Sequence, residues 1–175
     1  MKNGNGNGNK ILLILRHAKS SWKEPDLQDH DRPLNKRGKR DAPRIGKLLK
    51  KLDLVPDLII SSTAKRAKDT AKAVVKSSKY NGRLELNPSL YETDFDSYLR
   101  ALRLVPDDFN KVLIVGHNPA LEELVSVLTG RMEHMPTCAL AEVELKISSW
   151  NNIGNKVEGQ LINIWRPREL DENIQ

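Results

Sequence analysis

The stretch ILLILRHAKSSW, residues 11–22, changes abruptly from aliphatic to charged and polar residues. Five aliphatic residues in succession are typical of a strand that is buried on both faces of a sheet. Arg16 and His17 follow this run directly, and the chain turns polar within a few residues. The stretch therefore predicts a buried strand that presents an arginine and a histidine at its carboxyl end.

The same alternation continues along the chain, where apolar runs of strand length alternate with segments whose apolar residues recur at helical spacing. The next strand-like runs are DLIIS, RLEL and KVLIVG, at residues 57–61, 83–86 and 111–116. Buried strands separated by amphipathic helices indicate a mostly parallel sheet covered on both faces. Two later runs, at residues 139–147 and 159–166, have no helical pattern between them and should pair antiparallel. We therefore predict an α/β fold with a mostly parallel central sheet.

The length and composition fit one domain of ordinary size. The chain has 175 residues, of which 38% are hydrophobic and 30% charged, which is typical of a folded globular protein. We expect a flexible Gly/Asn-rich tail at residues 1–10, a single domain over 11–170 and a polar tail at 171–175. The tail at 1–10 lacks the apolar core of a secretion signal, no apolar run has membrane length, and a single cysteine cannot form an intramolecular disulfide. With no coiled-coil repeat either, the default expectation is a cytoplasmic monomer that binds no membrane.

The formal net charge of +6 raises the question of nucleic acid, because phosphate backbones attract clustered lysine and arginine. The cations at residues 36–54 and 64–79 alternate with apolar residues at helical spacing, which is typical of solvated helix faces. No nucleic-acid motif accompanies them. We therefore expect no nucleic-acid partner, and a basic nucleic-acid-binding module with structural histidines is the more distant alternative.

Polar side chains follow three of the predicted strands where each strand ends. Arg16 and His17 follow the first strand, SSTAKR with Arg66 follows the second, and HNP with His117 follows KVLIVG. Open α/β sheets bind ligands in the crevice beyond the carboxyl ends of their strands. We therefore expect these two arginines and two histidines to meet around one anion-sized space.

The helices that begin after these strands add to the argument. Arg66 falls in the first turn of its helix, where a positive charge opposes the helix dipole unless an anion binds there. Amide groups at a helix start and a guanidinium together form a phosphate pocket. We expect Ser62 or Thr63 to cap this helix, and Asn118 to cap the helix after the third motif with Pro119 in its first position.

Other notable side chains have plainer interpretations. His30 and His134 lie in polar, loop-like surroundings and are interpreted as surface residues. Cys138 lies in an apolar strand and is expected to be a core residue and not a nucleophile. Trp22 should either border the pocket or cover the edge of the core.

Two arginines and two histidines, without a metal-ligand spacing such as H-E-x-x-H, indicate phosphoryl chemistry in which guanidinium groups replace a metal ion. A neutral imidazole can attack phosphorus and form a phosphohistidine that water then hydrolyses. Neighbouring cations would lower the pKa of that imidazole, and a hydrogen bond from one ring nitrogen to a backbone carbonyl would leave the other nitrogen free to attack. We therefore expect no metal and no cofactor, and a metal hydrolase is a third class that the lack of clustered carboxylates and histidines disfavours.

Three motifs, LRHAKSSW, SSTAKRAKDTA and VGHNPALEELV, resemble the core motifs of the histidine phosphatase superfamily, which has the phosphoglycerate mutase-like fold. The segments DHDRPLNKRGKRDA, LYE and MPTCALAEVEL resemble its small SixA-type phosphohistidine phosphatase branch. The resemblance extends from about residue 11 to residue 170. It implies a three-layer α/β/α sandwich and an enzyme that needs no metal.

The resemblance also implies roles for individual residues. It makes His17 the nucleophile that becomes phosphorylated. It makes Arg16, Arg66 and His117 the groups that bind the phosphoryl oxygens and stabilise the transition state.

The proton donor to the leaving group is left open by the resemblance. Glu92, in SLYETDFD, matches the family's carboxylate position, and Asp31 in DHDRPL is a second candidate. Ala18 stands where most of the superfamily has glycine, and Thr63 replaces a common proline. Neither change removes a charged group.

The expected substrate follows from the size of the chain and from leaving-group chemistry. Superfamily members that act on sugar or inositol phosphates tend to add a lobe over the pocket, for which this sequence has no room. A phosphorylated imidazole leaves easily once protonated and demands little of a general acid. We therefore expect a phosphatase acting on a phosphohistidine carrier protein, with a small-molecule phosphomonoesterase of the same superfamily as the alternative.

Overall fold

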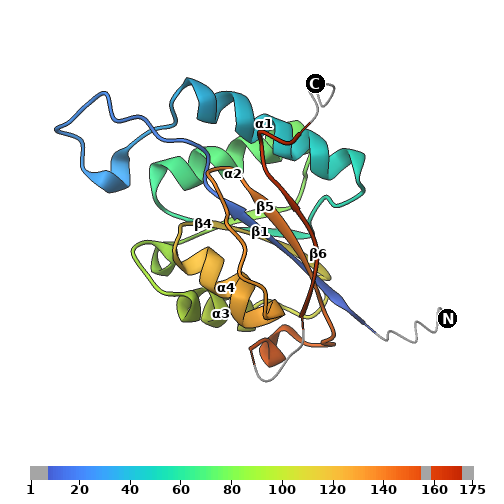
Figure 1. The fold of residues 1–175 in the computed structure, drawn as a ribbon. Helices are drawn as coiled ribbons and strands as arrows, with labels where there is room; N and C mark the ends of the chain where they lie inside the picture. The colour runs from blue at the N-terminus through green and yellow to red at the C-terminus, as the bar shows by residue number, and fades with distance from the viewer. Residues whose placement is uncertain (1–7, 155–158, 171–175) are drawn as a thin grey trace.

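The computed structural model describes residues 8–154 and 159–170 of the chain (Figure 1). Residues 1–7 of the predicted N-terminal tail and the whole predicted tail at 171–175 lie outside the described residues. The described strands are β1 (Lys10–Arg16), β2 (Leu58–Ser62), β3 (Arg83–Asn87), β4 (Lys111–Gly116), β5 (Leu140–Leu145) and β6 (Gly159–Trp165). The described helices are α1 (Lys36–Lys51), α2 (Lys65–Ser78), α3 (Phe95–Arg103) and α4 (Ala120–Thr129), with short 3₁₀ turns η1 (Asp29–Asp31), η2 (Pro88–Leu90) and η3 (Trp150–Asn152).

These strands form one sheet in the order β3-β2-β4-β1-β5-β6. The pairs β2–β3, β2–β4 and β1–β4 are parallel, and β1 places Arg16 opposite Gly116 of β4. Strand β5 pairs antiparallel with both β1 and β6, which confirms the predicted closing hairpin. Because β1, β2 and β4 run parallel and side by side, their carboxyl ends lie at the same edge of the sheet.

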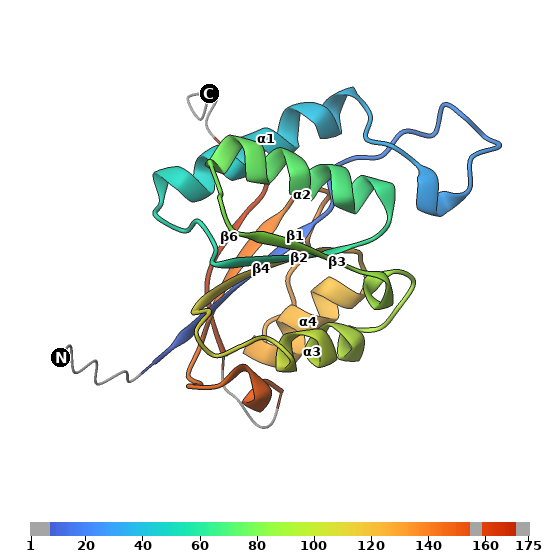
Figure 2. The same cartoon turned by 180° about the vertical axis from the view of Figure 1, so that it is seen from behind.

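Helices cover both faces of this sheet, with α1 and α2 on one side and α3 and α4 on the other (Figure 2). A hydrophobic core lies on each face of the sheet. Successive residues of β1 pack alternately in these two cores, since side chains alternate across a strand. Leu13 and Leu15 pack in the core beneath α1 and α2, whereas Leu12 and Ile14 pack in the core beneath α3 and α4. All four are fully buried. The predicted three-layer α/β/α sandwich is therefore confirmed.

The domain begins one residue earlier than we predicted. Lys10 was assigned to the tail at 1–10, but it is the first residue of β1 and only 3% exposed. Its Nζ donates to the carbonyl of Asp107 at 2.6 Å and to Oδ1 of Asn110 at 2.8 Å. A lysine can be buried at a strand start because these oxygens satisfy its ammonium group.

The longest connection on the site side of the sheet runs between β1 and α1, and residues 19–35 of it form an arm that extends away from the body of the fold (Figures 1 and 2). The base of the arm is closed by a bridge between Ser20 and Leu34 and by the Asn35 amide, which donates to the Lys19 carbonyl at 2.9 Å. Asn35 also caps α1, since its side chain accepts from the Gly38 amide. Among the described helices, none combines the length and the apolar character needed to cross a membrane.

Helices α1 and α2 approach each other closely at Gly46. A Cβ atom added there would lie 1.9 Å from Oγ of Ser77 and 2.7 Å from the carbonyl oxygen of Val74. Both distances are far below van der Waals contact. The absence of a side chain at this position is what allows the two helices to pack.

Gly46→Ala should therefore lower the free energy of unfolding by roughly 1–2 kcal/mol, because the overpacking cost exceeds the helix-propensity gain of about 1 kcal/mol. Urea denaturation measures the change. Adding Ser77→Ala should recover part of the loss, since only the contact with the Val74 backbone then remains. A more stable Gly46→Ala protein would contradict the close approach.

Candidate active site

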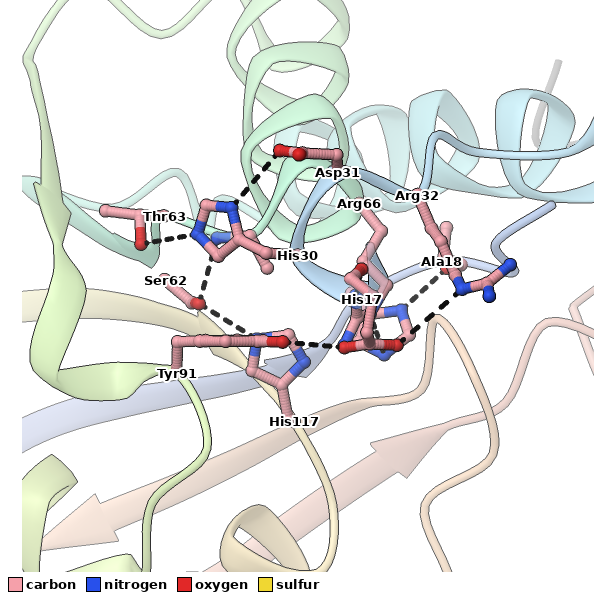
Figure 3. Close-up of polar contacts among 12 residues, drawn as sticks. His17, Ala18, His30, Asp31, Arg32, Ser62, Thr63, Arg66, Tyr91 and His117 are labelled. Atoms are coloured by element: carbon pink, nitrogen blue, oxygen red, sulfur yellow. Dashed lines mark hydrogen bonds and ion pairs between the residues drawn. The ribbon is translucent and has the colours of Figure 1, made fainter. Parts of the chain in front are cut away.

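The structure brings together both histidines predicted at the strand ends and Arg66 (Figure 3). The His17 and His117 rings have centroids 5.0 Å apart, and Nε of Arg66 lies 3.4 Å from Nε2 of His17. Arg16 ends β1, donates from Nη1 to the Met135 carbonyl at 2.9 Å, and its charge acts on both imidazoles. The side chains that follow β1, β2 and β4 thus surround one pocket, as their position in the sequence predicts.

The ring of His17 is held in one orientation. Its Nδ1 lies 2.8 Å from the carbonyl oxygen of Ala18, which can only accept, so Nδ1 carries the proton. The Ala18 amide in turn donates to Oγ1 of Thr70 at 2.9 Å. Nε2 is therefore left unprotonated beside Arg66, which is the arrangement predicted for an imidazole that attacks through one nitrogen.

Burial keeps both imidazoles neutral. The pKa of His17 is lowered to about 4 by burial and by the positive charges of Arg66 and Arg16 together, against the effect of the Ala18 hydrogen bond. The pKa of His117 is lowered to about 3, chiefly by burial and also by His17 and Arg66. At neutral pH each ring therefore carries a proton on only one of its two nitrogens.

His117 has a free hydrogen-bond donor in this pocket. The Ser62 hydroxyl accepts a hydrogen bond from the Ala64 amide at 3.3 Å. The proton of this hydroxyl can therefore be donated to Nε2 of His117, 2.8 Å from Oγ. The proton of His117 then resides on Nδ1, which is buried and has no partner among the described residues. Nε of Arg16 is also buried and has no hydrogen-bond partner among the described residues. Two unpaired buried nitrogens next to Arg66 suit an oxyanion, which would accept from them.

The cap predictions for two helices were wrong, because the polar side chains are used in the site instead. Helix α2 has Ala64 at its N-cap position and no side-chain cap, while Ser62 binds His117. Helix α4 has Pro119 at its N-cap position. The Asn118 amide donates to Oε1 of Glu122 and to the Met135 carbonyl, so it ties the helix to the loop after it.

The sequence analysis missed Asp29 and Tyr91, which form hydrogen bonds at the site. Arg66 donates from Nη2 to Oδ2 of Asp29 at 2.9 Å and from Nη1 to the Asp29 carbonyl at 2.7 Å. The Tyr91 hydroxyl donates to the same Oδ2 at 2.9 Å. Burial raises the pKa of Asp29, but these two hydrogen bonds and the charge of Arg66 outweigh it, so the pKa is lowered and the carboxylate stays ionised. Asp29 thus holds the end of the guanidinium and leaves its Nε edge facing His17.

His30 lies at the surface, as interpreted, with its side chain 39% exposed, but it also contacts residues of the site. Its Nε2 lies 3.1 Å from Oγ1 of Thr63, and its ring meets Tyr91 edge-on at 4.8 Å. The arm carries it back over the site, which no local pattern in the sequence indicates. His134 agrees better with the prediction, since it is exposed and pairs with Glu122.

The two candidate proton donors lie at the rim. Glu92 is exposed, has φ of 48°, and makes no hydrogen bond to the two histidines or two arginines of the pocket within the described residues. Its charge helps to raise the pKa of Tyr91, after burial and Asp29. Asp31 is exposed and lies 3.4 Å from Nδ1 of His30. A catalytic role for either carboxylate stays a prediction.

The remaining residues are placed as follows. Cys138 is 1% exposed, and burial raises the pKa of its thiol, as expected for a core residue. Trp22 is 65% exposed, and the Arg32 guanidinium lies over its ring at 4.0 Å. Among residues 8–154 and 159–170, no three His, Cys, Asp or Glu side chains group so as to hold a metal ion.

Comparison with known proteins agrees with this fold and site. Residues 12–102 match the histidine phosphatase superfamily (branch 1). An uncharacterised chloroplastic protein of Arabidopsis thaliana is 34% identical over 150 residues, which cover 79% of this chain and 68% of that protein. The chain therefore belongs to the histidine phosphatase superfamily, branch 1, whose enzymes are histidine-dependent phosphatases or mutases. Because that relative is chloroplastic, a cytoplasmic location stays a prediction.

Solved structures show the same fold. A candidate phosphohistidine phosphatase SixA from Agrobacterium tumefaciens is similar with a TM-score of 0.78 and 27% identity, covering 90% of this chain and 98% of that one. The protein histidine phosphatase SixA complexed with tungstate is similar with a TM-score of 0.79 and 23% identity, covering 92% and 99%. These similarities confirm the phosphoglycerate mutase-like fold.

The lowered pKa values predict that stability falls in mild acid. The unfolded histidines titrate near 6.5 and the folded ones at about 4 and 3, so the unfolded state binds more protons in between. The free energy of unfolding should therefore fall between pH 7 and pH 5, by on the order of 2 kcal/mol for each histidine. The double variant His17→Asn/His117→Asn should show a weaker pH dependence in urea titrations. An equally steep dependence in the variant would show that these rings titrate normally.

Asp29→Asn should lower kcat by about 10-fold, because Arg66 loses the charged partner that orients it toward the phosphoryl oxygens. The matched control is Asp26→Asn, an exposed residue of the same arm, which should leave kcat unchanged. A rise in substrate affinity in Asp29→Asn would instead mean that the carboxylate competes with the phosphoryl group for Arg66.

Proposed function

We propose that this chain is a protein phosphohistidine phosphatase that forms a phosphoenzyme on His17 and needs no metal ion. The observation that carries the proposal is the His17 ring, whose Nδ1 proton is fixed on the Ala18 carbonyl while the unprotonated Nε2 accepts only a long hydrogen bond of 3.4 Å from Nε of Arg66. An unprotonated, oriented nitrogen beside a guanidinium is suited to attack a phosphorus atom.

The proposed reaction has two steps. Nε2 of His17 attacks phosphorus in line, the new N–P bond forms, and the bond to the leaving imidazole breaks. That imidazole departs neutral when its other ring nitrogen already carries a proton. Water then attacks the phosphorus of the phosphoenzyme, the N–P bond breaks with its electron pair returning to Nε2 of His17, and a water proton passes to a phosphoryl oxygen. Phosphate and neutral His17 are released.

Three donors would stabilise the transferring group. The guanidinium groups of Arg16 and Arg66 and the Nδ1–H of His117 line the pocket, and charge-assisted hydrogen bonds from such groups stabilise the charge that builds up on phosphoryl oxygens. The two guanidinium groups supply positive charge where other phosphatases use a metal ion. The unpaired Nε of Arg16 and Nδ1 of His117 would gain partners when the phosphoryl group binds.

The short connections around the pocket support a substrate displayed on a protein. Residues 63–64 join β2 to α2, and residues 117–119 join β4 to α4. Within the described residues, the arm is the longest segment at this edge of the sheet, and it extends outward beside the pocket (Figure 1). The similarity to the candidate SixA of Agrobacterium tumefaciens supports the same substrate class.

The test is to incubate the purified protein with a histidine-phosphorylated peptide and locate the trapped phosphate by mass. We expect the label on His17, hydrolysis that a chelator does not slow, and at least a 1,000-fold loss of rate in His17→Ala, about the cost of removing a covalent nucleophile. Label on another residue would overturn the mechanism. Rapid hydrolysis of a phosphate monoester with no action on the phosphohistidine peptide would favour the small-molecule alternative.

A further inference from the structure

A basic groove of about 430 Å³ lies between the start of α1 and the segment that follows β6. Its charged lining consists of four arginines and two carboxylates: Arg37, Arg40, Arg166, Arg168, Asp41 and Glu169. The two walls are fixed to each other, because Arg44 of α1 donates to the carbonyls of Pro167 and Leu170 at 3.2 and 3.0 Å. The groove is therefore a built feature of the fold.

The positive charge of the basic groove is only partly neutralised. Asp41 is buried and its Oδ1 lies 2.9 Å from Nε of Arg40 and 3.8 Å from Nη1 of Arg44. Arg166 pairs with Glu133 and Glu169. Arg37 and Arg168 are both exposed, and neither forms an ion pair with any residue in the described part of the chain. Two guanidinium groups on opposite walls are therefore free to bind carboxylates.

The lining of the groove is connected to the catalytic site through backbone hydrogen bonds. Nη2 of Arg37 lies 3.4 Å from Oγ1 of Thr137. The next residue, Cys138, donates its amide to the carbonyls of Arg16 and His17 at 3.1 and 3.0 Å. The loop segment that lines the groove at Thr137 is therefore hydrogen-bonded, one residue further on, to the backbone of the nucleophile.

The opposite side of the same loop is acidic. A second hollow, of about 510 Å³, is lined by Glu122, Glu123 and Glu133 beside the start of α4. The loop that carries His134 borders both hollows. Glu133 is paired with Arg131 and Arg166, so the negative charge on this side comes from Glu122 and Glu123. A docking protein therefore meets positive charge toward α1 and negative charge toward α4, which would orient it.

We propose that the basic groove binds an acidic segment of the phosphorylated protein, within a few residues of its phosphohistidine. This inference rests on the proposed function and adds the surface chemistry of the partner. Glutamate and aspartate side chains of the substrate pair with Arg37 and Arg168, since guanidinium groups bind carboxylates in a bidentate manner. The groove thereby contributes to recognition of the substrate without touching the phosphoryl group.

The experiment uses two synthetic peptides of equal length, each with one phosphohistidine. One carries glutamates three to five residues away on both sides, about 10–17 Å along an extended chain, and the other carries glutamines at the same positions. For the unaltered protein we expect kcat/KM about 10-fold higher on the glutamate peptide, and the ratio should shrink as salt is added.

Variants assign this preference to the groove. In Arg37→Glu/Arg168→Glu, kcat/KM on the glutamate peptide should fall to the value on the glutamine peptide or below it. Turnover of phosphoramidate, which has no flanking groups, should stay unchanged. The matched control Lys47→Glu/Lys51→Glu makes the same charge change on exposed positions further along α1 and should keep the preference. Circular dichroism checks that both variants are folded.

Each outcome separates the two proposals. The groove proposal would be overturned if the unaltered protein had equal kcat/KM on the two peptides, or if the Lys47/Lys51 control also lost the preference. Either result would leave the proposed function intact. If neither phosphohistidine peptide is hydrolysed while a phosphate monoester is, the proposed function fails and the groove proposal fails with it.

Discussion

The site depends on one constraint, which is that three parallel strands end at the same edge of a sheet buried on both faces. Strand β1 lies between β4 and β5, and its register with β4 places Arg16 opposite Gly116. His17 and His117 therefore leave neighbouring strands at the same level. The burial that stabilises the strands also excludes water from the two rings, so the same packing that forms the sheet lowers the pKa of both imidazoles.

The fold and the centre of the site could be predicted because their signals are local. Continuous aliphatic runs identify buried strands, and the polar residue directly after each run is placed by topology at the edge where ligands bind. Arg16, His17, Arg66 and His117 all follow from this reasoning. The resemblance to a known superfamily adds roles to these residues, and the strand order shows why they are close.

The parts that were missed lie where the chain has no periodic pattern. Asp29 and His30 are carried by the arm, and the direction in which a long loop returns is set by tertiary contacts such as those of Asp29 with Arg66 and Tyr91. The capping errors at Ser62 and Asn118 have a related cause. A hydroxyl or an amide that could satisfy a helix end can also satisfy a neighbouring polar group, and sequence alone does not rank the two.

The buried thiol has a consequence for where such an enzyme can work. Phosphatases with a cysteine nucleophile need an exposed thiolate, and that thiolate is what peroxide oxidises. Here the nucleophile proposed is a ring nitrogen, and the single cysteine, Cys138, is enclosed in the core with a raised pKa. Neither group is a target for oxidation by peroxide. An enzyme of this design would therefore keep its activity under oxidising conditions that inactivate a phosphatase with a cysteine nucleophile.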